Sequence, residues 1–371
     1  MRLEAAAGHR RRGIHRRQLL SLLERDPSRR PSGGADALTY AGNLASLAPL
    51  IEAQRLRFVH GDVGDHERVM ALLAEEDIDT IVNFAAESHV DRSIEDPQGF
   101  LRTNVMGTHA LLEAALRVWR HCAAGSRRFH HVSTDEVYGS LGPQAPAFTE
   151  STAYAPNSPY SASKAAADHI VRAYGHTYAL PCTISNCSNN YGRYQFPEKL
   201  LPLCIVNILE GRALPIYGDG LQVRDWLHVS DHCRAIDLIL QSSAAGETWN
   251  VGGGSSEPNL RVVEMLCDLV DEEFAHDRQL AARFPRSPAA QGRSSRTLMQ
   301  FVSDRPGHDR RYAVDGSKIA GLGFVAQTLL AAGLTATVRW YLDNERWWRA
   351  IISGEYRAGN AQQHAGPAAS S

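Results

Sequence analysis

Two short segments of the chain carry residues that can do redox and acid-base chemistry together. Residues 133–139 read Ser-Thr-Asp-Glu-Val-Tyr-Gly, and residues 160–164 read Tyr-Ser-Ala-Ser-Lys. A tyrosine and a lysine four positions apart on a helix project from the same face. The ammonium group of Lys164 can then favour the ionised form of Tyr160, whose ordinary pKa of about 10 is too high for a base at neutral pH. The adjacent carboxyl groups of Asp135 and Glu136 are available for further proton transfers.

Alternating strands and helices are predicted to position these residues. Residues 56–63 and 78–86 are short apolar runs, and a helix-like segment at 66–76 lies between them. A second helix is expected at about 103–119 and a further strand at 129–133. Strands that alternate with helices of this length indicate parallel βαβ units. The fold class is therefore predicted to be α/β, with a doubly wound parallel (Rossmann) sheet.

Polar residues follow the predicted strands at the points where each strand ends. In doubly wound sheets, ligands bind beyond the carboxyl ends of the strands. Asp62, residues 85–88 and residues 133–136 all fall there. Neighbouring residues on a regular strand point to opposite faces, so Asp135 and Glu136 can act on one substrate only if the strand has ended or turned before them. Gly139 is compatible with such a turn.

The second half of the chain has a different texture. Turns rich in Pro, Gly and aromatic residues follow residue 190, as at 214–220 and 304–308. This pattern predicts a smaller, irregular α/β substrate domain. Residues 277–298 contain several Arg, Ser and Pro and are expected to be a flexible, disordered insertion, and the same is expected of the tail at 358–371.

Composition excludes several classes of protein. Lys and Arg total 39 against 41 for Asp and Glu in 371 residues, so the net charge of -2 gives no electrostatic reason to expect nucleic acid or an anionic membrane as the main partner. No stretch approaches the roughly 18 to 20 apolar residues of a membrane span. The six cysteines form no Cys-x-x-Cys pair, which argues against a zinc module or a disulfide framework. We expect no metal, and a reducing cytoplasm is the simplest setting.

Five further segments, taken with Thr134, Tyr160 and Lys164, identify a family resemblance. The three residues resemble the extended short-chain dehydrogenase/reductase superfamily. The five segments occur in the same order as in the dTDP-glucose 4,6-dehydratases, which the chain resembles from about residue 36 to about residue 357. They are residues 38–44 (Leu-Thr-Tyr-Ala-Gly-Asn-Leu), 85–93 (Ala-Ala-Glu-Ser-His-Val-Asp-Arg-Ser), 134–139, 186–192 (Asn-Cys-Ser-Asn-Asn-Tyr-Gly) and 304–310 (Asp-Arg-Pro-Gly-His-Asp-Arg).

The resemblance implies a role for each residue of the two opening segments. Tyr160 would take the proton of the sugar 4-hydroxyl while a hydride moves from C4 to NAD, with Thr134 orienting the hydroxyl and Lys164 holding the nicotinamide ribose. Glu136 would then remove the proton from C5, and Asp135 would protonate the departing 6-hydroxyl. The hydride would return to C6, which gives dTDP-4-keto-6-deoxy-glucose without net use of NAD. Such a product belongs to deoxysugar (rhamnose-type) nucleotide biosynthesis.

The resemblance also implies domains, binding residues and partners. It makes residues 1–190 the NAD-binding Rossmann domain, with residues 1–35 atypical, and residues 191–357 the part that binds the sugar nucleotide dTDP-glucose, with interwoven return segments. A homodimer in the cytoplasm is expected. The cofactor contacts would be Asp36, Thr39, Asp62, Val63, Ala85, Ala86, Ser88, Thr103, Tyr160, Lys164 and Asn190. The substrate contacts would be Thr134, Asn189, Lys199, Leu200, Pro215, Ile216, Tyr217, Arg224, Asn259, Asp304, Arg305, Pro306, Gly307 and His308. For Arg224 taken alone, an ion pair with Asp225 or another acid is an equal alternative.

The beginning of the chain departs from this pattern. An NAD domain should open with an apolar strand that runs into Gly-x-x-Gly-x-x-Gly, whose glycines let the backbone approach the pyrophosphate. Residues 1–17 contain no apolar strand pattern and only Gly8 and Gly13. A helix is expected at 18–25, but Pro-Ser-Gly-Gly at 31–34 replaces the apolar second strand. We therefore expect the first strand of the sheet to be missing or improvised.

A local reading-frame error would explain this departure. With suitable codons, a shift of one base across residues 9–16 converts the encoded sequence into Thr-Gly-Gly-Ala-Gly-Phe-Ile-Gly, which is the missing fingerprint. A second disturbance would lie near residues 29–35. Two alternatives are an organelle transit peptide, which Glu4 and the lack of a Ser-rich amphipathic pattern disfavour, and a basic nucleic-acid-binding arm.

Two other functions remain open at the level of sequence. A sugar-nucleotide 4-epimerase on the same scaffold would need Thr134, Tyr160 and Lys164 but not the two carboxyl groups, so the presence of Asp135 and Glu136 favours the dehydratase. The chain could also be a catalytically impaired sugar-nucleotide-binding protein, because its NAD-binding fingerprint is absent.

Overall fold

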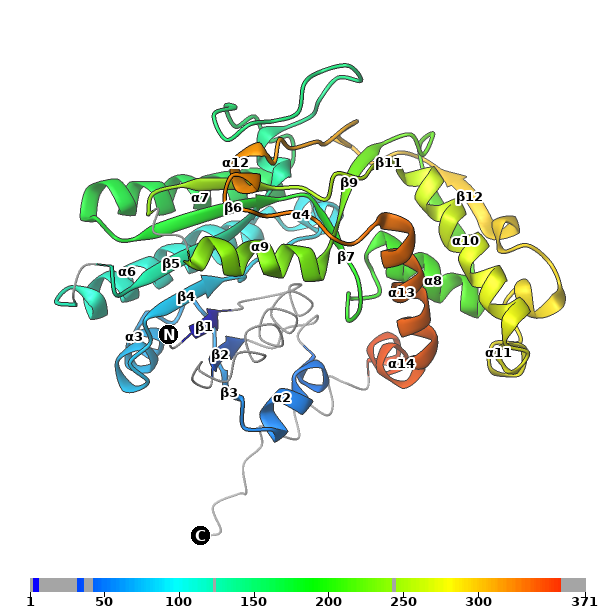
Figure 1. Cartoon of the computed structure of the whole chain (residues 1–371), viewed down its shortest axis with the longest axis horizontal. Coiled ribbons are helices and arrows are strands. Elements are labelled where there is room, and N and C mark those ends of the chain that lie inside the picture. Colours follow the sequence, from blue (N-terminus) through cyan, green and yellow to red (C-terminus); the bar gives the residue numbers. More distant parts are fainter. Residues whose placement is uncertain (1–2, 7–31, 37–42, 123–124, 242–244, 355–371) are drawn as a thin grey trace, which may run out of the picture.

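A parallel sheet of seven strands, in the order β10-β6-β5-β4-β1-β2-β3, runs through the molecule (Figure 1). The computed structural model describes residues 3–6, 32–36, 43–122, 125–241 and 245–354. Its strands are β1 (Leu3–Ala6), β2 (Ser32–Asp36), β3 (Leu56–His60), β4 (Thr80–Asn83), β5 (Arg128–Thr134), β6 (Cys182–Cys187), β7 (Asn189–Tyr191), β8 (Leu214–Tyr217), β9 (Val223–His228), β10 (Thr248–Val251), β11 (Ser256–Pro258) and β12 (Met299–Val302).

The helical segments lie mostly between these strands. The α-helices are α2 (Ala48–Glu52), α3 (His66–Glu75), α4 (Val90–Glu95), α5 (Pro97–Phe100), α6 (Thr108–Trp119), α7 (Pro159–Tyr178), α8 (Leu200–Glu210), α9 (Val229–Gln241), α10 (Asn259–His276), α11 (Gln279–Arg283), α12 (Ser317–Ala320), α13 (Leu330–Asp343) and α14 (Glu345–Ser353). Shorter turns are the 3-10 segments η1 (Leu44–Ser46), η3 (Asp135–Tyr138), η4 (Ala289–Gln291) and η5 (Ser295–Leu298), and the π-helical segment η2 (Leu101–Gly107). None of the helices in the described ranges is long and apolar enough to cross a bilayer.

Helices cover both faces of the large sheet, as expected for a doubly wound fold. Helices α3, α6 and α7 pack on one face, where Leu111 and Val171 share a core with Phe129 of β5. Helix α9 packs on the other face, where Ile236 meets Val132 of β5. Phe129 and Val132 belong to opposite faces because side chains alternate along a strand. The arrangement confirms the predicted α/β class with a parallel Rossmann sheet.

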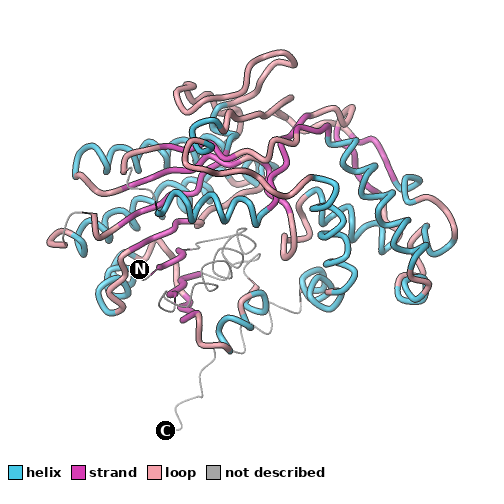
Figure 2. The backbone as a smooth tube through the Cα atoms, in the orientation of Figure 1, coloured by secondary structure: helices cyan, strands magenta, loops and turns pink. Residues whose placement is uncertain are grey.

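The second half of the chain forms a smaller part beside the sheet (Figure 2). Helices α8, α10 and α13 enclose an apolar core that includes Ile205, Leu266 and Val338. Two small sheets, β11-β9-β7 and β12-β8, lie against this core. The chain also returns to the large sheet, because β10 pairs in parallel with β6. The domain boundary at residue 190 stays a prediction.

The first two strands are formed, so the first strand is not missing but is improvised from residues without an apolar strand pattern, which is the second of the two outcomes expected for it. Strand β1 pairs in parallel with β4 from Leu3 with Thr80 to Ala6 with Asn83. Strand β2 pairs in parallel with β3 from Ser32 with Leu56 onwards. Pairing in a sheet uses backbone N–H and C=O groups, which every residue here except proline supplies. The predicted helix at 18–25, Gly8, Gly13, Thr39 and the tail at 358–371 lie outside the described residues.

Residues 277–298 are ordered, so the predicted flexible insertion is also wrong. Leu280 and Phe284 of this segment are buried in the core formed by α8, α10 and α13. The backbone N–H and the hydroxyl of Ser295 bind the carboxylate of Asp271, with the hydroxyl at 2.5 Å. Arg296 pairs with Asp268 on α10 through two hydrogen bonds of 2.8 and 2.6 Å. Two apolar anchors and these polar contacts fix a segment whose composition alone indicated disorder.

Candidate active site

The turn after β5 presents two carboxyl groups at one place. Strand β5 ends at Thr134, whose hydroxyl accepts a hydrogen bond of 3.3 Å from Glu136 N, and the chain then enters η3. Gly139 closes the turn with φ at +90°, and a Cβ atom there would lie 2.4 Å from Ala155 O. Only glycine adopts this backbone conformation readily. The predicted end of the strand before Asp135 and Glu136 is confirmed.

A pocket at the carboxyl ends of β5 and β6 collects many of the predicted site residues. Those in its lining are Ser88, Thr134, Asp135, Glu136, Tyr160, Asn189, Asn190, Lys199 and Leu200. The lining also includes Cys187, Ser188, Gln195, Phe196, Leu201 and Trp226, which were not predicted. Gln195 and Phe196 lie three and four residues after the 186–192 segment, and this closeness to a recognised motif is the sequence signal that could have identified them as site residues.

Asp135 is adapted to hold a proton. It is 1% exposed, and burial is the main reason that its pKa is raised well above the ordinary value. The nearby negative charges of Glu136 and Asp225 raise the pKa further, while Arg224 and the hydrogen bond from Thr134 oppose the rise. A carboxyl group with a raised pKa remains protonated nearer to neutral pH and can serve as an acid.

Glu136 has the same burial effect but more positive neighbours. Burial raises its pKa, and the charges of Lys199, Arg305 and Arg224 lower it in that order. Lys199 Nζ donates to Ser88 O at 3.0 Å across the pocket. Three cations favour the carboxylate form of Glu136, so of the two adjacent carboxyl groups Glu136 is better placed to be the base.

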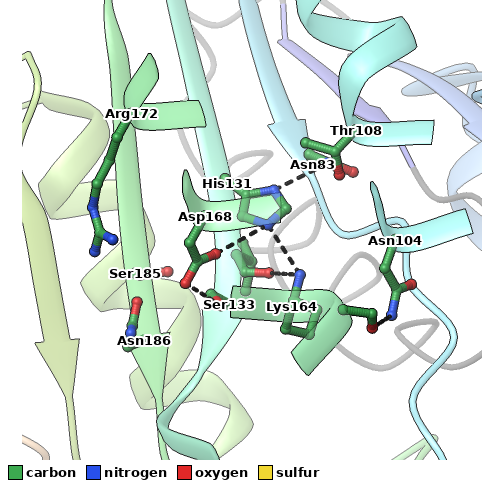
Figure 3. A network of polar contacts seen from close by, with 12 residues as sticks. Asn83, Asn104, Thr108, His131, Ser133, Lys164, Asp168, Arg172, Ser185 and Asn186 are labelled. Atoms are coloured by element: carbon green, nitrogen blue, oxygen red, sulfur yellow. Dashed lines mark hydrogen bonds and ion pairs between the residues drawn. The ribbon is translucent and has the colours of Figure 1, made fainter. Parts of the chain in front are cut away.

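Tyr160 and Lys164 lie one turn apart on α7. A capping box between Ser158 and Ser161 starts the helix, with Pro159 in its first turn. Tyr160 is 4% exposed and packs edge-on against Phe100 with ring centroids 6.2 Å apart. The Lys164 side chain runs inwards, and its Nζ lies 3.0 Å from His131 Nε2 and 3.0 Å from Val132 O (Figure 3).

Most predicted cofactor residues lie at or just after the carboxyl ends of β2, β3 and β4. The order of the strands reverses between β4 and β1, and such a switch point is where dinucleotides bind in doubly wound folds. Asp62 and Thr103 line one hollow at this edge, and Asp62 Oδ1 accepts a hydrogen bond of 2.8 Å from Gly64 N. Val63, Ala85 and Ala86 are buried, and Asp36 ends β2. The polar and small residues present at this edge fit a dinucleotide.

Arg224 is buried on β9 and does not pair with Asp225. Its guanidinium donates to Val223 O and Asp309 O at 2.8 Å each and lies 4.2 Å above the ring of Tyr312. Asp225 instead accepts hydrogen bonds from the backbone N–H groups of Gly253 and Ser255. Burial lowers the pKa of Arg224, and its charge acts on Asp135 and Glu136. The structure therefore does not support the alternative of an ion pair with Asp225.

The other predicted substrate residues form a group beside the pocket but are not in its lining. They are Pro215, Ile216 and Tyr217 of β8, Asn259 at the start of α10, and residues 304–308. Gln222 links the last two of these segments, since its O accepts from Asn259 N at 3.0 Å and its Nε2 donates to Asp304 Oδ2 at 3.1 Å. His308 Nδ1 lies 2.6 Å from Asp304 Oδ1, and Arg305 lies 3.5 Å from Asp91.

Comparison with known sequences gives one consistent result. The family profile described as GDP-mannose 4,6 dehydratase matches residues 22–337. A dTDP-glucose 4,6-dehydratase of Xanthomonas campestris pv. campestris (strain B100) is 52% identical over 326 residues, which are 87% of this chain and 89% of that protein. The dTDP-glucose 4,6-dehydratase 1 of Escherichia coli (strain K12) is 47% identical over 343 residues, covering 89% and 91%.

Comparison with solved structures agrees. The dTDP-glucose 4,6-dehydratase DesIV of Streptomyces venezuelae, solved with NAD and TYD bound, is similar with a TM-score of 0.81 and 43% identity over 95% of this chain and 100% of that chain. A UDP-glucuronic acid 4-epimerase of Bacillus cereus has a TM-score of 0.77 at 24% identity, covering 92% and 99%. The second likeness concerns the fold alone.

Proposed function

Because this chain belongs to the GDP-mannose 4,6 dehydratase family, with dTDP-glucose 4,6-dehydratases among its relatives, we propose that it converts dTDP-glucose into dTDP-4-keto-6-deoxy-glucose. One observation carries the proposal. Asp135 and Glu136 line the same pocket as Tyr160, because β5 ends just before them. An acid, a base and an oxidation site at one place are what a dehydration that begins with an oxidation requires.

Oxidation at C4 is assigned to the β5 and α7 residues. The Tyr160 phenolate takes the proton of the sugar 4-hydroxyl, and the Thr134 hydroxyl orients that group. Lys164, one turn further along α7, lowers the pKa of the phenol through its positive charge and binds the ribose of the cofactor. NAD, when bound, supplies the hydride acceptor for this chemistry.

Dehydration is assigned to the two carboxyl groups. A ketone at C4 makes the proton on C5 acidic, and Glu136 removes it as a carboxylate that Lys199, Arg305 and Arg224 favour. Asp135, which holds its proton because it is buried, protonates the 6-hydroxyl so that water leaves. General acid and base groups of this kind contribute about two to four orders of magnitude in rate.

The cofactor is held by residues at the edge where the strand order reverses. Asp36 and Thr39 would bind the adenosine ribose, Asp62 and Val63 the adenine, and Ala85, Ala86, Ser88, Thr103 and Asn190 the remainder. The NAD bound in the solved structure of DesIV supports NAD as the cofactor. The absence of Gly-x-x-Gly-x-x-Gly from residues 1–35 is the one feature that favours a second candidate, a sugar-nucleotide-binding protein with impaired NAD binding.

The sugar nucleotide is held by the smaller part of the molecule. Arg224 offers a planar set of charged donors to the diphosphate. Asn189, Lys199 and Leu200 line the pocket itself. The β8 residues, Asn259 and residues 304–308 would bind the nucleotide. A homodimer in the cytoplasm belongs to the same proposal.

The test uses the purified chain with dTDP-glucose and added NAD. Formation of a 4-keto product that absorbs in alkaline ultraviolet supports the dehydratase. Formation of the 4-epimer without loss of water would contradict it and favour the epimerase. Nucleotide binding without turnover, even at saturating NAD, would favour the impaired binding protein.

A further inference from the structure

Residues 188–190 line the pocket together and form one of its walls (the 188–190 wall). The main chain leaves the large sheet at Cys187, where β6 ends, and enters the smaller β11-β9-β7 sheet at Asn189, where β7 begins. Ser188 lies between the two strands, and its N–H donates to Val251 O at 3.0 Å. The wall is therefore a crossing between two sheets. The regular ladder of backbone hydrogen bonds is interrupted at such a crossing, so side chains are needed to fix it.

The Asn190 side chain folds back over this crossing. Its Nδ2 donates to Ser188 O at 2.9 Å and to Cys187 Sγ at 3.3 Å. A carbonyl oxygen can only accept, so the amide nitrogen of Asn190 faces Ser188 and the amide oxygen faces the other way. The backbone carbonyl of Asn190 is held as well, because Gln195 Nε2 donates to it at 2.8 Å. The two N–H groups of the Asn190 amide therefore have partners within the chain.

His232 is the partner of the amide oxygen of Asn190. It lies near the start of α9 and is fully buried, and its Nδ1 is 3.0 Å from Asn190 Oδ1. An amide oxygen only accepts, so His232 Nδ1 is the donor and carries a proton. Helix α9 thereby holds the 188–190 wall through a side chain that does not itself line the pocket.

Cys187 connects the same hydrogen bonds to the turn after β5. Its sulfur accepts from Asn190, and its thiol donates to Ser133 O at 3.3 Å. Ser133 directly precedes Thr134, where β5 ends. All the groups donate in one direction, from His232 through Asn190 and Cys187 to Ser133. Hydrogen bonds in such a series polarise and strengthen one another, most of all in a buried setting.

We infer that His232 is a positioning residue, which acts through Asn190 and Cys187 to fix the 188–190 wall against the turn at residues 134–136. The inference rests on the proposed function, which assigns the wall to the ligands and the turn to the chemistry. A displacement of about 1 Å between groups that hold a substrate and groups that react with it can cost about 100-fold in rate. His232 performs this role with a fixed proton on Nδ1 and takes no part in proton transfer.

Two substitutions separate the hydrogen bond of His232 from its bulk. His232→Asn keeps a donor in place, because Nδ2 of asparagine and Nδ1 of histidine are both bonded to Cγ. His232→Leu fills the space but removes the donor. His130→Gln is the matched control, since His130 is equally buried on β5 and its ring nitrogens lie 2.9 Å from Thr183 Oγ1 and 3.1 Å from Ser185 Oγ. That substitution disturbs β5 and β6 without touching the hydrogen bonds that start at His232.

The proton on the His232 ring is tested by ¹⁵N NMR of the full chain with labelled histidine at about pH 7. Signals that disappear in His232→Asn assign the ring, and if that variant does not fold, the signals that shift in Asn190→Ala assign it. We expect a proton on Nδ1. A neutral ring with its proton on Nε2 alone would overturn the inference, whether or not the chain is active.

The positioning role is tested by separating the oxidation step from nucleotide binding. In single turnovers with dTDP-glucose and saturating NAD, the absorbance of NADH reports oxidation, and calorimetric titration with dTDP reports binding of the nucleotide. His232→Leu should slow oxidation by about tenfold, the equivalent of one hydrogen bond, with dTDP affinity unchanged. His232→Asn should recover most of the rate, and His130→Gln should keep the rate of the parent chain.

Two results would overturn the positioning role. One is a His232→Leu chain that melts at a lower temperature but oxidises the sugar at the parent rate, which would make His232 purely structural. The other is a loss of rate that His232→Asn does not recover. An inactive parent chain would instead contradict the proposed function, and the NMR result would then test the inference by itself.

Discussion

Two regions of the large sheet differ in how extensively their strands pair. One is formed by β5 and α7, and the other by β1 and β2. Strand β5 pairs with β6 from Phe129 with Cys182 to Thr134 with Cys187, and α7 packs across it. Strand β1 pairs with β2 through Glu4 and Gly33 alone. The family profile begins at residue 22, so it leaves out β1 but includes β2 and the whole of β5 and α7.

The difference shows that a β-strand can form from many residue types, whereas a turn that binds a pyrophosphate requires particular residues. Backbone groups alone pair β1 with β4, and the residues Leu-Glu-Ala-Ala are sufficient for that. A turn that approaches a pyrophosphate closely needs glycine at fixed positions, and residues 1–35 do not provide them. The β5 and α7 side therefore has every residue type that the proposed reaction needs. The β1 and β2 side forms its strands but lacks the glycine fingerprint for the pyrophosphate.

The largest effect is expected at Glu136. Glu136→Gln keeps the size of the side chain but removes the base, so dehydration should fall by about two to four orders of magnitude. Oxidation at C4 needs Tyr160 and Lys164 and should continue, so NADH should accumulate with substrate present. The absorbance of NADH and chromatography of the product measure both steps. Normal dehydration in this variant would remove Glu136 from the mechanism.

A large effect on NAD binding is expected when the fingerprint is restored. Replacing residues 9–16 by Thr-Gly-Gly-Ala-Gly-Phe-Ile-Gly should tighten NAD binding by about tenfold or more, which is about 1.4 kcal/mol. Calorimetric titration with NAD measures the change, and the same insert with alanine at each glycine is the control. Equal NAD affinity of the parent chain, the chain with the restored fingerprint and the alanine control would show that the missing glycines do not weaken NAD binding.

The nucleotide sequence of the gene provides an independent test of this difference. If the departure is a reading-frame error, the codons of residues 9–16 yield the fingerprint when read one base later. Codons that do not yield it would contradict the frame hypothesis.

A smaller effect is expected at the turn that presents the two carboxyl groups. Gly139→Ala places a Cβ where Ala155 O lies 2.4 Å away, at a positive φ, so unfolding should be easier by about 1 to 3 kcal/mol. Turnover should fall as well, because Asp135 and Glu136 would move. Gly142→Ala is the control, since a Cβ there meets nothing within 4 Å. Denaturant unfolding measures both, and equal stability of the two variants would argue against a strained turn.

The smallest effect is expected from Asp135 on stability. The folded pKa of Asp135 is above its unfolded value of about 3.9, so the folded chain binds more protons and loses stability as pH rises from about 4. Asp135→Asn lacks this loss. Its thermal stability should be close to that of the parent at about pH 4 and should exceed it at about pH 8. A variant that is less stable at every pH would show that the carboxyl group is not held protonated by burial.

The sequence predicted the structure best where the hydrophobic pattern of a segment matches the face that it buries in the core. Strands β3, β4 and β5 and helices α3 and α6 were predictable from short apolar runs that alternate with helix-like segments of ordinary length. The order of residues 277–298 was not predictable, since its few apolar residues that pack on the core, such as Leu280 and Phe284, are separated by Arg, Ser and Pro. Long-range polar contacts such as Ser295 with Asp271 leave no periodic signal.

The partners of Lys164 illustrate the same limit at the site. Asp168 continues the spacing of four from Tyr160 and Lys164, so its place on the helix face was visible in the sequence. His131 was not, because only the packing of β5 on α7 shows that His131 and Ser133 face Lys164 and Asp168 while His130 faces away. Spacing locates residues within one element, but contact between elements comes from the fold.

The central claim, that one pocket oxidises C4 and completes a dehydration, is tested most directly with dTDP-glucose carrying deuterium at C4. The purified chain with NAD should yield dTDP-4-keto-6-deoxy-glucose with the deuterium retained at C6, as mass spectrometry of the product would show. A 4-keto-6-deoxy product without deuterium at C6 would contradict the account. A 4-epimer that keeps its 6-hydroxyl group would also contradict it.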